Sequence, residues 1–135
     1  MTVLCEWRGV VENAELDRLH AQAFGPRLHP DDERDWDLLL AQHSLGWVVA
    51  RKDDRLVGFV NVVWDGCKHA WVQDTMVADE ARNQGIGTQM ILMVRSECRR
   101  SGCTWLHADF SEDLRPFYLD SCGFTPTSAG LIRLG

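Results

Sequence analysis

The chain has 135 residues, of which 45% are hydrophobic, so it is long enough for one domain with a single well-buried core. Its 14 lysines and arginines stand against 20 acidic residues, and the formal net charge of −6 disfavours nucleic acid as a partner. No stretch approaches the roughly 20 apolar residues of a membrane helix, and residues 1–10 lack the apolar run of a secretory leader. We therefore expect one soluble, cytoplasmic domain over residues 1–135, without membrane association.

The first elements are predicted to be a strand over residues 3–10 and a helix over residues 13–24. Asn13 is a suitable cap for this helix, whose apolar residues recur at helical spacing. A second helix is expected over about residues 31–42, because acidic residues crowd its first turn. Its expected buried residues are Trp36, Leu39 and Leu40.

The middle of the chain changes to a pattern that is typical of strands. Residues 47–50, 56–64 and 68–77 are rich in β-branched and aromatic side chains. A polar turn over residues 51–55 separates the first two, and Asp65-Gly66 is a hairpin signal between the second and the third. We expect these three strands to form an antiparallel meander.

An amphipathic helix over residues 88–100 follows, and then a strand over residues 103–108. Because a helix joins it to the strand at 68–77, the pair should be a parallel crossover unit. A short helix over residues 116–120 and a last strand over residues 131–134 complete the prediction. The fold class is therefore α/β of the α+β type, a mixed and mostly antiparallel sheet flanked by helices, with one parallel crossover.

The five cysteines are an odd number and lack the paired short spacing of a zinc site. Cys98 and Cys103 are the nearest pair, but no histidine lies close to them at ligand spacing. We expect reduced thiols and no metal site.

Two glycines, Gly85 and Gly87, lie where a predicted strand passes into a predicted helix. Such a turn presents unpaired backbone N–H groups to an anion, and glycine allows both unusual dihedral angles and close approach of a phosphate. Arg82 can add a charge-assisted contact. A P-loop would need Lys-Ser or Lys-Thr where Thr88 follows Gly87, and a dinucleotide-binding fingerprint would need a small residue where Met90 stands.

The segment over residues 74–87 resembles motif A of the GCN5-related N-acetyltransferase (GNAT) family, whose pattern is (Gln or Arg)-x-x-Gly-x-(Gly or Ala). Residues 82–87 match that pattern. Tyr118 and Gly123-Phe124 resemble the terminal motif of the family, and the order of elements agrees along nearly the whole chain. The resemblance implies a GNAT-like fold with the parallel crossover at the cofactor site.

The resemblance also implies that acetyl-CoA binds where the strands at 68–77 and 103–108 part. The backbone of Met76 and Val77 is expected to bond the amides of the pantetheine arm, and the N–H groups of residues 84–88 are expected to hold the pyrophosphate. The predicted cofactor-binding residues are Met76, Val77, Arg82, Asn83, Gln84, Gly85, Ile86, Gly87, Thr88 and Ser111.

The chain departs from the family pattern at two places. Ser111 stands where many members have Asn, which puts a side-chain contact to pantetheine in question. Four residues separate Tyr118 from Gly123, where three are more usual. The second departure leaves open whether Tyr118 or Leu119 faces the cofactor.

Acetyl transfer to an amine needs a base, because an alkylamine with a pKa near 10.4 is almost wholly protonated at neutral pH (about 7). Asp74, near the cofactor end of its strand, is the candidate base, acting directly or through water. Tyr118, the single tyrosine of the chain, matches the position of the family's acid and is the candidate that protonates the departing thiolate. Cys122 is a poor nucleophile candidate, because it lies in a turn without an evident histidine partner.

The acceptor pocket is expected between the helix at 13–24, the loop to residue 31 and the central strands. Each candidate lining residue also has an ordinary structural explanation, such as a surface histidine or a core tryptophan. The candidates are His20, Phe24, Arg27, His29, Trp36, Asn61 and Trp71.

These observations predict an N-acetyltransferase that moves an acetyl group from acetyl-CoA to a primary amine of a small molecule by direct attack in a ternary complex. Two alternatives stay open, a non-catalytic acyl-CoA-binding regulatory module and a protein N-acetyltransferase. A nicotinamide-nucleotide protein is disfavoured by Met90. The identity of the acceptor is open, and the chain is expected to be a monomer or a homodimer.

Overall fold

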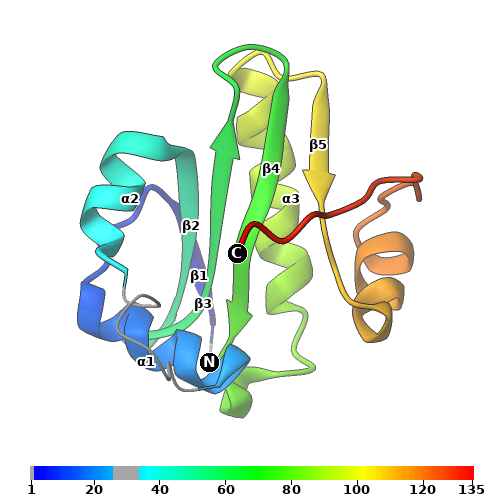
Figure 1. Ribbon diagram of the computed structural model, residues 1–135. Helices are drawn as coiled ribbons and strands as arrows, with labels where there is room; N and C mark the ends of the chain where they lie inside the picture. Colours follow the sequence, from blue (N-terminus) through cyan, green and yellow to red (C-terminus); the bar gives the residue numbers. More distant parts are fainter. Residues whose placement is uncertain (1, 26–33) are drawn as a thin grey trace.

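The computed structural model describes residues 2–25 and 34–135 and contains one five-stranded sheet. The strands lie side by side in the order in which they occur in the chain, and the pairs formed among the first four are all antiparallel (Figure 1). The last strand runs parallel to the fourth. The predicted mixed sheet with a parallel crossover is thus confirmed. The strands are β1 (Leu4–Trp7), β2 (Ser44–Lys52), β3 (Arg55–Trp64), β4 (His69–Val77) and β5 (Trp105–Ala108).

Helices cover both faces of the sheet, with α1 (Asn13–Phe24) and α2 (Trp36–His43) on one face and α3 (Ile86–Arg100) on the other (Figure 1). Neighbouring residues of β3 show the two layers, since adjacent side chains of a strand point to opposite faces. Phe59 meets Trp36 of α2 edge to face, with ring centroids 5.9 Å apart. A Cβ at Gly58 would lie 3.0 Å from the sulfur of Met90 in α3, so glycine allows this helix its close approach.

The crossover helix α3 forms because its apolar residues recur at helical spacing and meet the sheet. Met90, Ile91 and Val94 are fully buried, whereas arginines occupy the last turn. Gly102 follows the helix with φ of 92°, a conformation that glycine accepts without strain. The helix begins at residue 86, two residues before the predicted start, so that Gly87 lies inside its first turn.

The two N-terminal helices are capped differently from the prediction. Glu12, and not Asn13, is the N-cap of α1. The Asn13 side chain instead accepts a hydrogen bond of 3.1 Å from the backbone N–H of Asp37, in the first turn of α2. Asp35 caps α2 by accepting from Leu38 N–H at 3.2 Å, so α2 begins at Trp36. Part of the expected earlier start, residues 31–33, lies outside the described residues.

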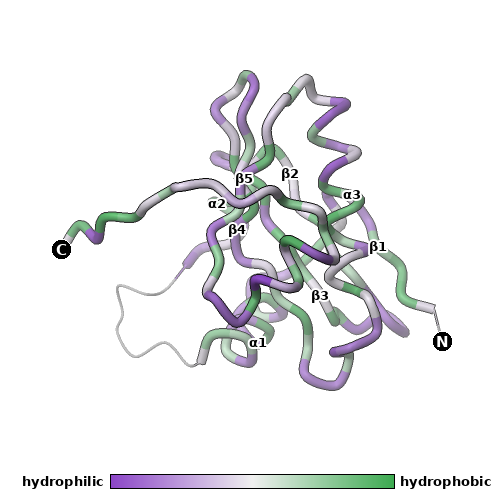
Figure 2. The backbone as a smooth tube through the Cα atoms, turned by 90° about the vertical axis from the view of Figure 1, so that its right-hand side faces the viewer, coloured by the Kyte–Doolittle hydropathy of each residue, from purple (hydrophilic) through white to green (hydrophobic). Residues whose placement is uncertain are grey.

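The predicted strand over residues 131–134 is wrong. Residues 124–135 form neither strand nor helix, and Leu131, Ile132 and Leu134 are 82%, 86% and 93% exposed. Figure 2 shows this end of the chain leaving the body of the molecule. A strand needs a neighbouring strand for its backbone hydrogen bonds, and a single chain supplies none here.

Other bounds differ more modestly from the prediction. β1 is shorter than the strand expected over residues 3–10, and β2 is longer than the one expected over residues 47–50, because it pairs with β1 and β3 together. In the described part of the chain, no helix has the length and apolar character needed to cross a lipid bilayer.

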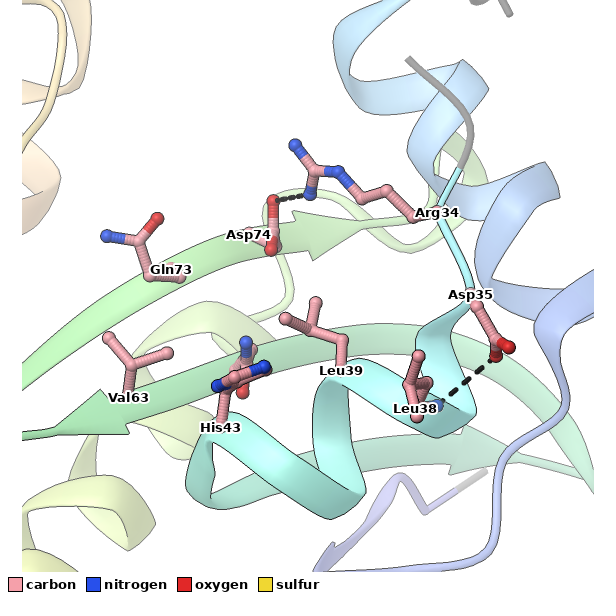
Figure 3. Close-up of a pocket in the computed structure, with 9 residues that line it drawn as sticks. Arg34, Asp35, Leu38, Leu39, His43, Val63, Gln73 and Asp74 are labelled. Atoms are coloured by element: carbon pink, nitrogen blue, oxygen red, sulfur yellow. Dashed lines mark hydrogen bonds and ion pairs between the residues drawn. The ribbon is translucent and has the colours of Figure 1, made fainter. Parts of the chain in front are cut away.

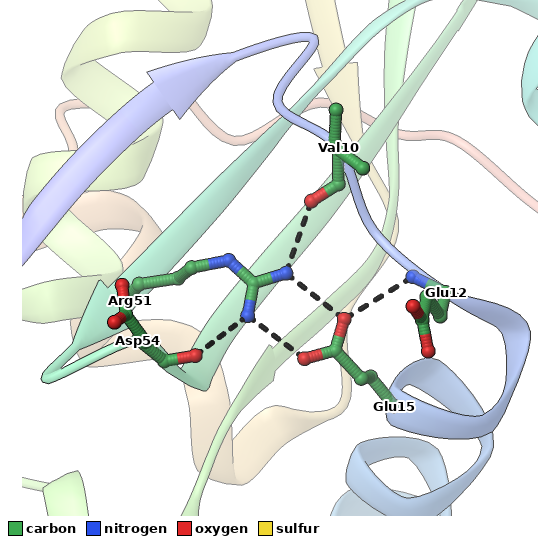
Figure 4. Close-up of polar contacts among 5 residues, drawn as sticks. All are labelled: Val10, Glu12, Glu15, Arg51 and Asp54. Atoms are coloured by element: carbon green, nitrogen blue, oxygen red, sulfur yellow. Dashed lines mark hydrogen bonds and ion pairs between the residues drawn. The ribbon is translucent and has the colours of Figure 1, made fainter.

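Arg51 ties β2 to the start of α1 (Figure 4). Its guanidinium binds both carboxylate oxygens of Glu15, at 2.8 and 2.9 Å, and donates to the backbone carbonyls of Val10 and Asp54, both at 3.0 Å. Glu15 also accepts from the backbone N–H of Glu12, the N-cap of α1. The Glu15 carboxylate therefore connects Arg51 of β2 to the start of α1. The hydrogen bond from Arg51 is the main cause that lowers the pKa of Glu15 below its usual value.

We expect Glu15→Gln to lower the free energy of unfolding at neutral pH by about 1–2 kcal/mol, because glutamine keeps the helix cap but loses the charge that meets Arg51. The pKa of Glu15 is lower in the folded state, so its contribution is present above the usual glutamate pKa of about 4.3 and disappears as pH falls through the folded value. Urea unfolding of both proteins at neutral and acidic pH measures the difference. Glu112→Gln, which breaks an exposed pair with Arg115, is the control and should change stability by less than about 0.5 kcal/mol. Equal losses in the two variants would contradict the assignment.

Candidate active site

The parallel strands β4 and β5 stay paired over only part of β4. Four residue pairs join them, from His69 with Trp105 to Val72 with Ala108, whereas β4 continues to Val77. On the side facing β5, residues 73–77 therefore have no strand partner. Their backbone N–H and C=O groups along this edge can bond an extended ligand. Met76 and Val77, which were predicted to use their main chain, lie in this stretch.

A β-bulge lies in the same stretch of β4. Asn61 of β3 is opposite Gln73, and Phe59 is opposite Met76, so three steps along β4 match two along β3. The bulge falls at Asp74, whose φ of 55° is uncommon for a residue other than glycine. Because of the extra residue, Gln73 and Met76 share one face of the sheet, while Thr75 points to the other face.

The turn after β4 leads through a short helical turn, Asp79–Ala81, into α3. Gly85 is the N-cap of α3 with φ of 78°, and a Cβ built there would meet nothing within 4 Å. The first hydrogen bond of the helix runs from Gln89 N–H to the Gly85 carbonyl, at 3.0 Å. The amides of residues 86–88 precede it and lack an acceptor within the helix, which makes this end of α3 suited to an anion.

The two glycines of the turn serve different purposes. Gly85 takes a left-handed conformation beside open space. Gly87 lies in the first turn of α3, where a Cβ would be 2.9 Å from the ring of Phe117. The missing side chain of Gly87 thus makes room for Phe117, whereas the sequence predicted that it makes room for a phosphate.

Two polar residues predicted to bind the cofactor have partners within the chain. Arg82 lies at the turn, half exposed, and forms a 3.3 Å ion pair with Asp79. The Ser111 hydroxyl donates a hydrogen bond of 2.5 Å to Asp113 and lies at the surface. A contact from Ser111 to pantetheine would require this bond to break.

Tyr118 reaches the unpaired edge of β4 from a π-helical turn, η4 (Pro116–Ser121). Its hydroxyl donates to the Thr75 hydroxyl at 3.2 Å, and its ring stacks on Phe110 with centroids 4.8 Å apart. The side chain is 5% exposed, and this burial raises its pKa above the usual tyrosine value. The backbone N–H of Cys122 donates to the carbonyl of Phe117, five residues earlier. This wider turn accommodates the extra residue that separates Tyr118 from Gly123 in comparison with the family pattern.

A pocket of about 460 Å³ opens beside the bulge, between β4 and α2 (Figure 3). Arg34, just before α2, reaches across it and forms a 2.7 Å ion pair with Asp74, whose side chain is 14% exposed. Asp74 thus lies both at the parting of the strands and in the wall of the pocket. The lining residues are Arg34, Asp35, Leu38, Leu39, His43, Asn61, Val63, Gln73 and Asp74.

The other predicted acceptor residues fall at different distances from this pocket. Asn61 lines it and is held by the Ser44 hydroxyl. Trp71 lies farther along the same face, stacked on His107 with centroids 4.8 Å apart. Phe24 and His20 pack on each other in α1, away from the lining. Arg27 and His29 lie outside the described residues.

Trp36 was predicted to line the pocket, but it is fully buried and belongs to the core. Its indole N–H donates to Asp17 at 3.0 Å, and its ring carries the guanidinium of Arg34, 5.3 Å from the centroid. Trp36 therefore supports the pocket through Arg34.

Sequence reasoning missed Arg34, His43, Gln73 and Thr75. The period-two alternation of β4 could have paired Gln73 with Trp71 on one face. No local pattern distinguishes Arg34 or His43, because both reach the pocket only through the packing of α2 against the sheet. Thr75 faces Tyr118 because the bulge at Asp74 changes the face of the sheet to which its side chain points.

All five cysteines are free thiols. Burial raises the pKa of the Cys122 thiol, and it raises that of Cys98 to about 12. Thiols with raised pKa values are poor nucleophiles at neutral pH. Cys98 and Cys122 are therefore poor candidates for a covalent intermediate.

The model of the acetyltransferase (GNAT) family matches residues 13–124. An aminoglycoside N-acetyltransferase, solved with a bisubstrate analogue that contains CoA, superposes with a TM-score of 0.79 at 19% identity, covering 100% of this chain and 99% of its own. A GNAT-family acetyltransferase from Streptococcus pneumoniae gives 0.76 at 23% identity, covering 99% and 98%. Glucosamine-6-phosphate N-acetyltransferase from Arabidopsis thaliana gives 0.74 at 16% identity, covering 99% of each chain.

None of the curated proteins compared with the chain matches it by sequence. At these identities the solved structures show a shared fold, and the family model shows membership over most of the chain. The sheet that parts at β4 and β5, the glycine turn and the sequence match agree with one another. The chain belongs to the GNAT family of acetyltransferases.

Proposed function

We propose that the chain transfers an acetyl group from acetyl-CoA to a primary amine of a small molecule, by direct attack in a ternary complex. The observation that carries the proposal is the position of Asp74, which lies at once on the unpaired edge of β4 and in the wall of the pocket. A donor bound along the edge and an acceptor bound in the pocket would meet there. Solved relatives named for aminoglycoside and glucosamine-6-phosphate acetylation support a small acceptor.

The residues present fit acetyl-CoA, which supplies an activated acetyl group when bound. The free backbone groups of Met76 and Val77 would hold the pantetheine arm. The amides of residues 84–88 would hold the pyrophosphate, and the open space at Gly85 admits it. Arg82 can add its charge by exchanging Asp79 for a phosphate oxygen.

Asp74 is the proposed base. The ammonium group of the acceptor must lose one proton before its nitrogen can attack, and a carboxylate on the pocket wall can take that proton directly or through water. Arg34 occupies one oxygen of Asp74, so the amine must use the other oxygen or displace Arg34. When the new C–N bond forms and the C–S bond breaks, nitrogen loses a second proton to solvent.

Tyr118 is the proposed acid for the departing sulfur. Its raised pKa keeps the hydroxyl protonated at neutral pH, and Thr75 fixes the direction of the hydroxyl. A thiolate with a pKa near 8.5 can accept this proton without a large penalty. Tyrosinate would then regain a proton from solvent and the Asp74 carboxyl group would release its proton to solvent, so that one proton is released overall for each amide formed.

Free thiols at all five cysteines support a cytoplasmic location for this enzyme, because disulfides are rare in reducing compartments.

The proposal is tested by measuring thiol release from acetyl-CoA with a panel of amines, for the wild type and Tyr118→Phe. We expect amine-dependent release, with kcat lowered about 100-fold or more in the variant and KM for acetyl-CoA nearly unchanged, because phenylalanine keeps the packing but has no proton to give. Unchanged kcat would remove Tyr118 from its role. Acetyl-CoA binding without release by any amine would favour a regulatory acyl-CoA-binding module.

A second prediction concerns the turn. Gly85→Ala should weaken acetyl-CoA binding about tenfold or more, because alanine disfavours the left-handed conformation that aims the amides at the ligand. Gly66→Ala is a matched control, since Gly66 has φ of 77° and equally open space in the hairpin after β3. Calorimetry of both variants gives the affinities, and thermal unfolding should show similar losses of stability. Equal affinity in the two variants would remove the turn from the cofactor site.

A further inference from the structure

The acceptor pocket holds one pair of opposite charges that meets across it (Figure 3). The guanidinium of Arg34 is 2.7 Å from the carboxylate of Asp74, and the ring of Trp36 supports it from behind. An α-amino acid carries its ammonium and carboxylate on one carbon, so the two charges of the ligand are as close as those of the pair. The ligand's carboxylate can take the place of Asp74 on Arg34 while its amine meets Asp74.

The charge balance of the pocket also favours a zwitterion. Among the lining residues that the structure describes, Asp35 is the other carboxylate, but it caps α2 through Leu38 N–H and lies 3.4 Å from the amide of Asn13. Apart from the imidazole of His43, one positive and one negative side chain, Arg34 and Asp74, are left for the ligand. A polyamine or aminoglycoside would bring several positive charges to a single available carboxylate, whereas an amino acid brings one charge of each sign.

The remaining wall of the pocket is partly apolar. Leu38, Leu39 and Val63 face it, and Val63 is directly opposite Trp71, which continues the same face of the sheet. Trp71 is partly exposed and stacks on His107, whose Nε2 is 2.8 Å from Nδ1 of His69. Asp74 and Trp71 are three residues apart, which corresponds to about 10 Å along the strand. This length suits an aromatic side chain.

Resting on the acetyl transfer proposed above, we propose that the acceptor is an α-amino acid with a large apolar side chain. Its amine lies at Asp74, its carboxylate binds Arg34, and its side chain points along β4 toward Val63 and Trp71.

The test compares phenylalanine with phenethylamine, which lacks only the carboxylate. The wild type should favour phenylalanine by about 10- to 100-fold in kcat/KM, as expected for one charge-assisted contact. Arg34→Gln should abolish this preference. The readout is the ratio of kcat/KM for phenylalanine to kcat/KM for phenethylamine, because any effect of the variant on Asp74 acts on both substrates. Arg55→Gln, which breaks an exposed pair with Glu80 outside the pocket, is the control and should keep the preference.

Trp71→Ala gives a second readout, since it should raise KM for phenylalanine more than KM for alanine. Faster acetylation of spermidine or an aminoglycoside than of phenylalanine, or a preference that survives Arg34→Gln, would overturn the inference and leave acetyl transfer standing. Absence of release with every amine, despite binding of acetyl-CoA, would overturn the proposed function itself.

Discussion

The bulge at Asp74 is the constraint on which the rest of the site depends. One extra residue in β4 changes which side chains share a face, so that Gln73 stays with the pocket while Thr75 turns toward Tyr118. The bulge coincides with the end of pairing between β4 and β5, because a locally bent strand no longer follows its neighbour. The unpaired backbone of β4, the Asp74 carboxylate and the Thr75 hydroxyl that accepts from Tyr118 therefore lie close together.

The segment after β5 closes this site from the side opposite the pocket. Phe117 packs on Gly87 at the start of α3, and Tyr118 lies within an aromatic cluster that includes Phe110 and Phe124. These contacts connect the start of α3 at Gly87, through Phe117, to the candidate acid Tyr118. The π-helical turn gives the segment the extra length it needs without turning Tyr118 away from β4.

The pocket depends on a different part of the fold. α2 is short, and its position is fixed by caps that it shares with α1, through Asn13 and Asp35. That arrangement brings Arg34 over the buried ring of Trp36 and within reach of Asp74. Trp36, which was predicted to line the pocket, therefore acts as a support for the charged pair, and Asn13, which was predicted to cap α1, helps to position α2.

The sequence by itself determined the order of elements, the parallel crossover and the glycine turn, because periodicity, hairpin residues and helix caps act over a few neighbouring positions. It also selected Asp74 and Tyr118 as the candidate base and acid, and these two roles stay predictions. The tertiary structure alone decided the bulge, the partner of Asp74, the separate purposes of Gly85 and Gly87, and the absence of a strand at residues 131–134. Each of these depends on which segment lies beside another, and a strand signal such as that of residues 131–134 cannot be fulfilled without a partner for its backbone hydrogen bonds.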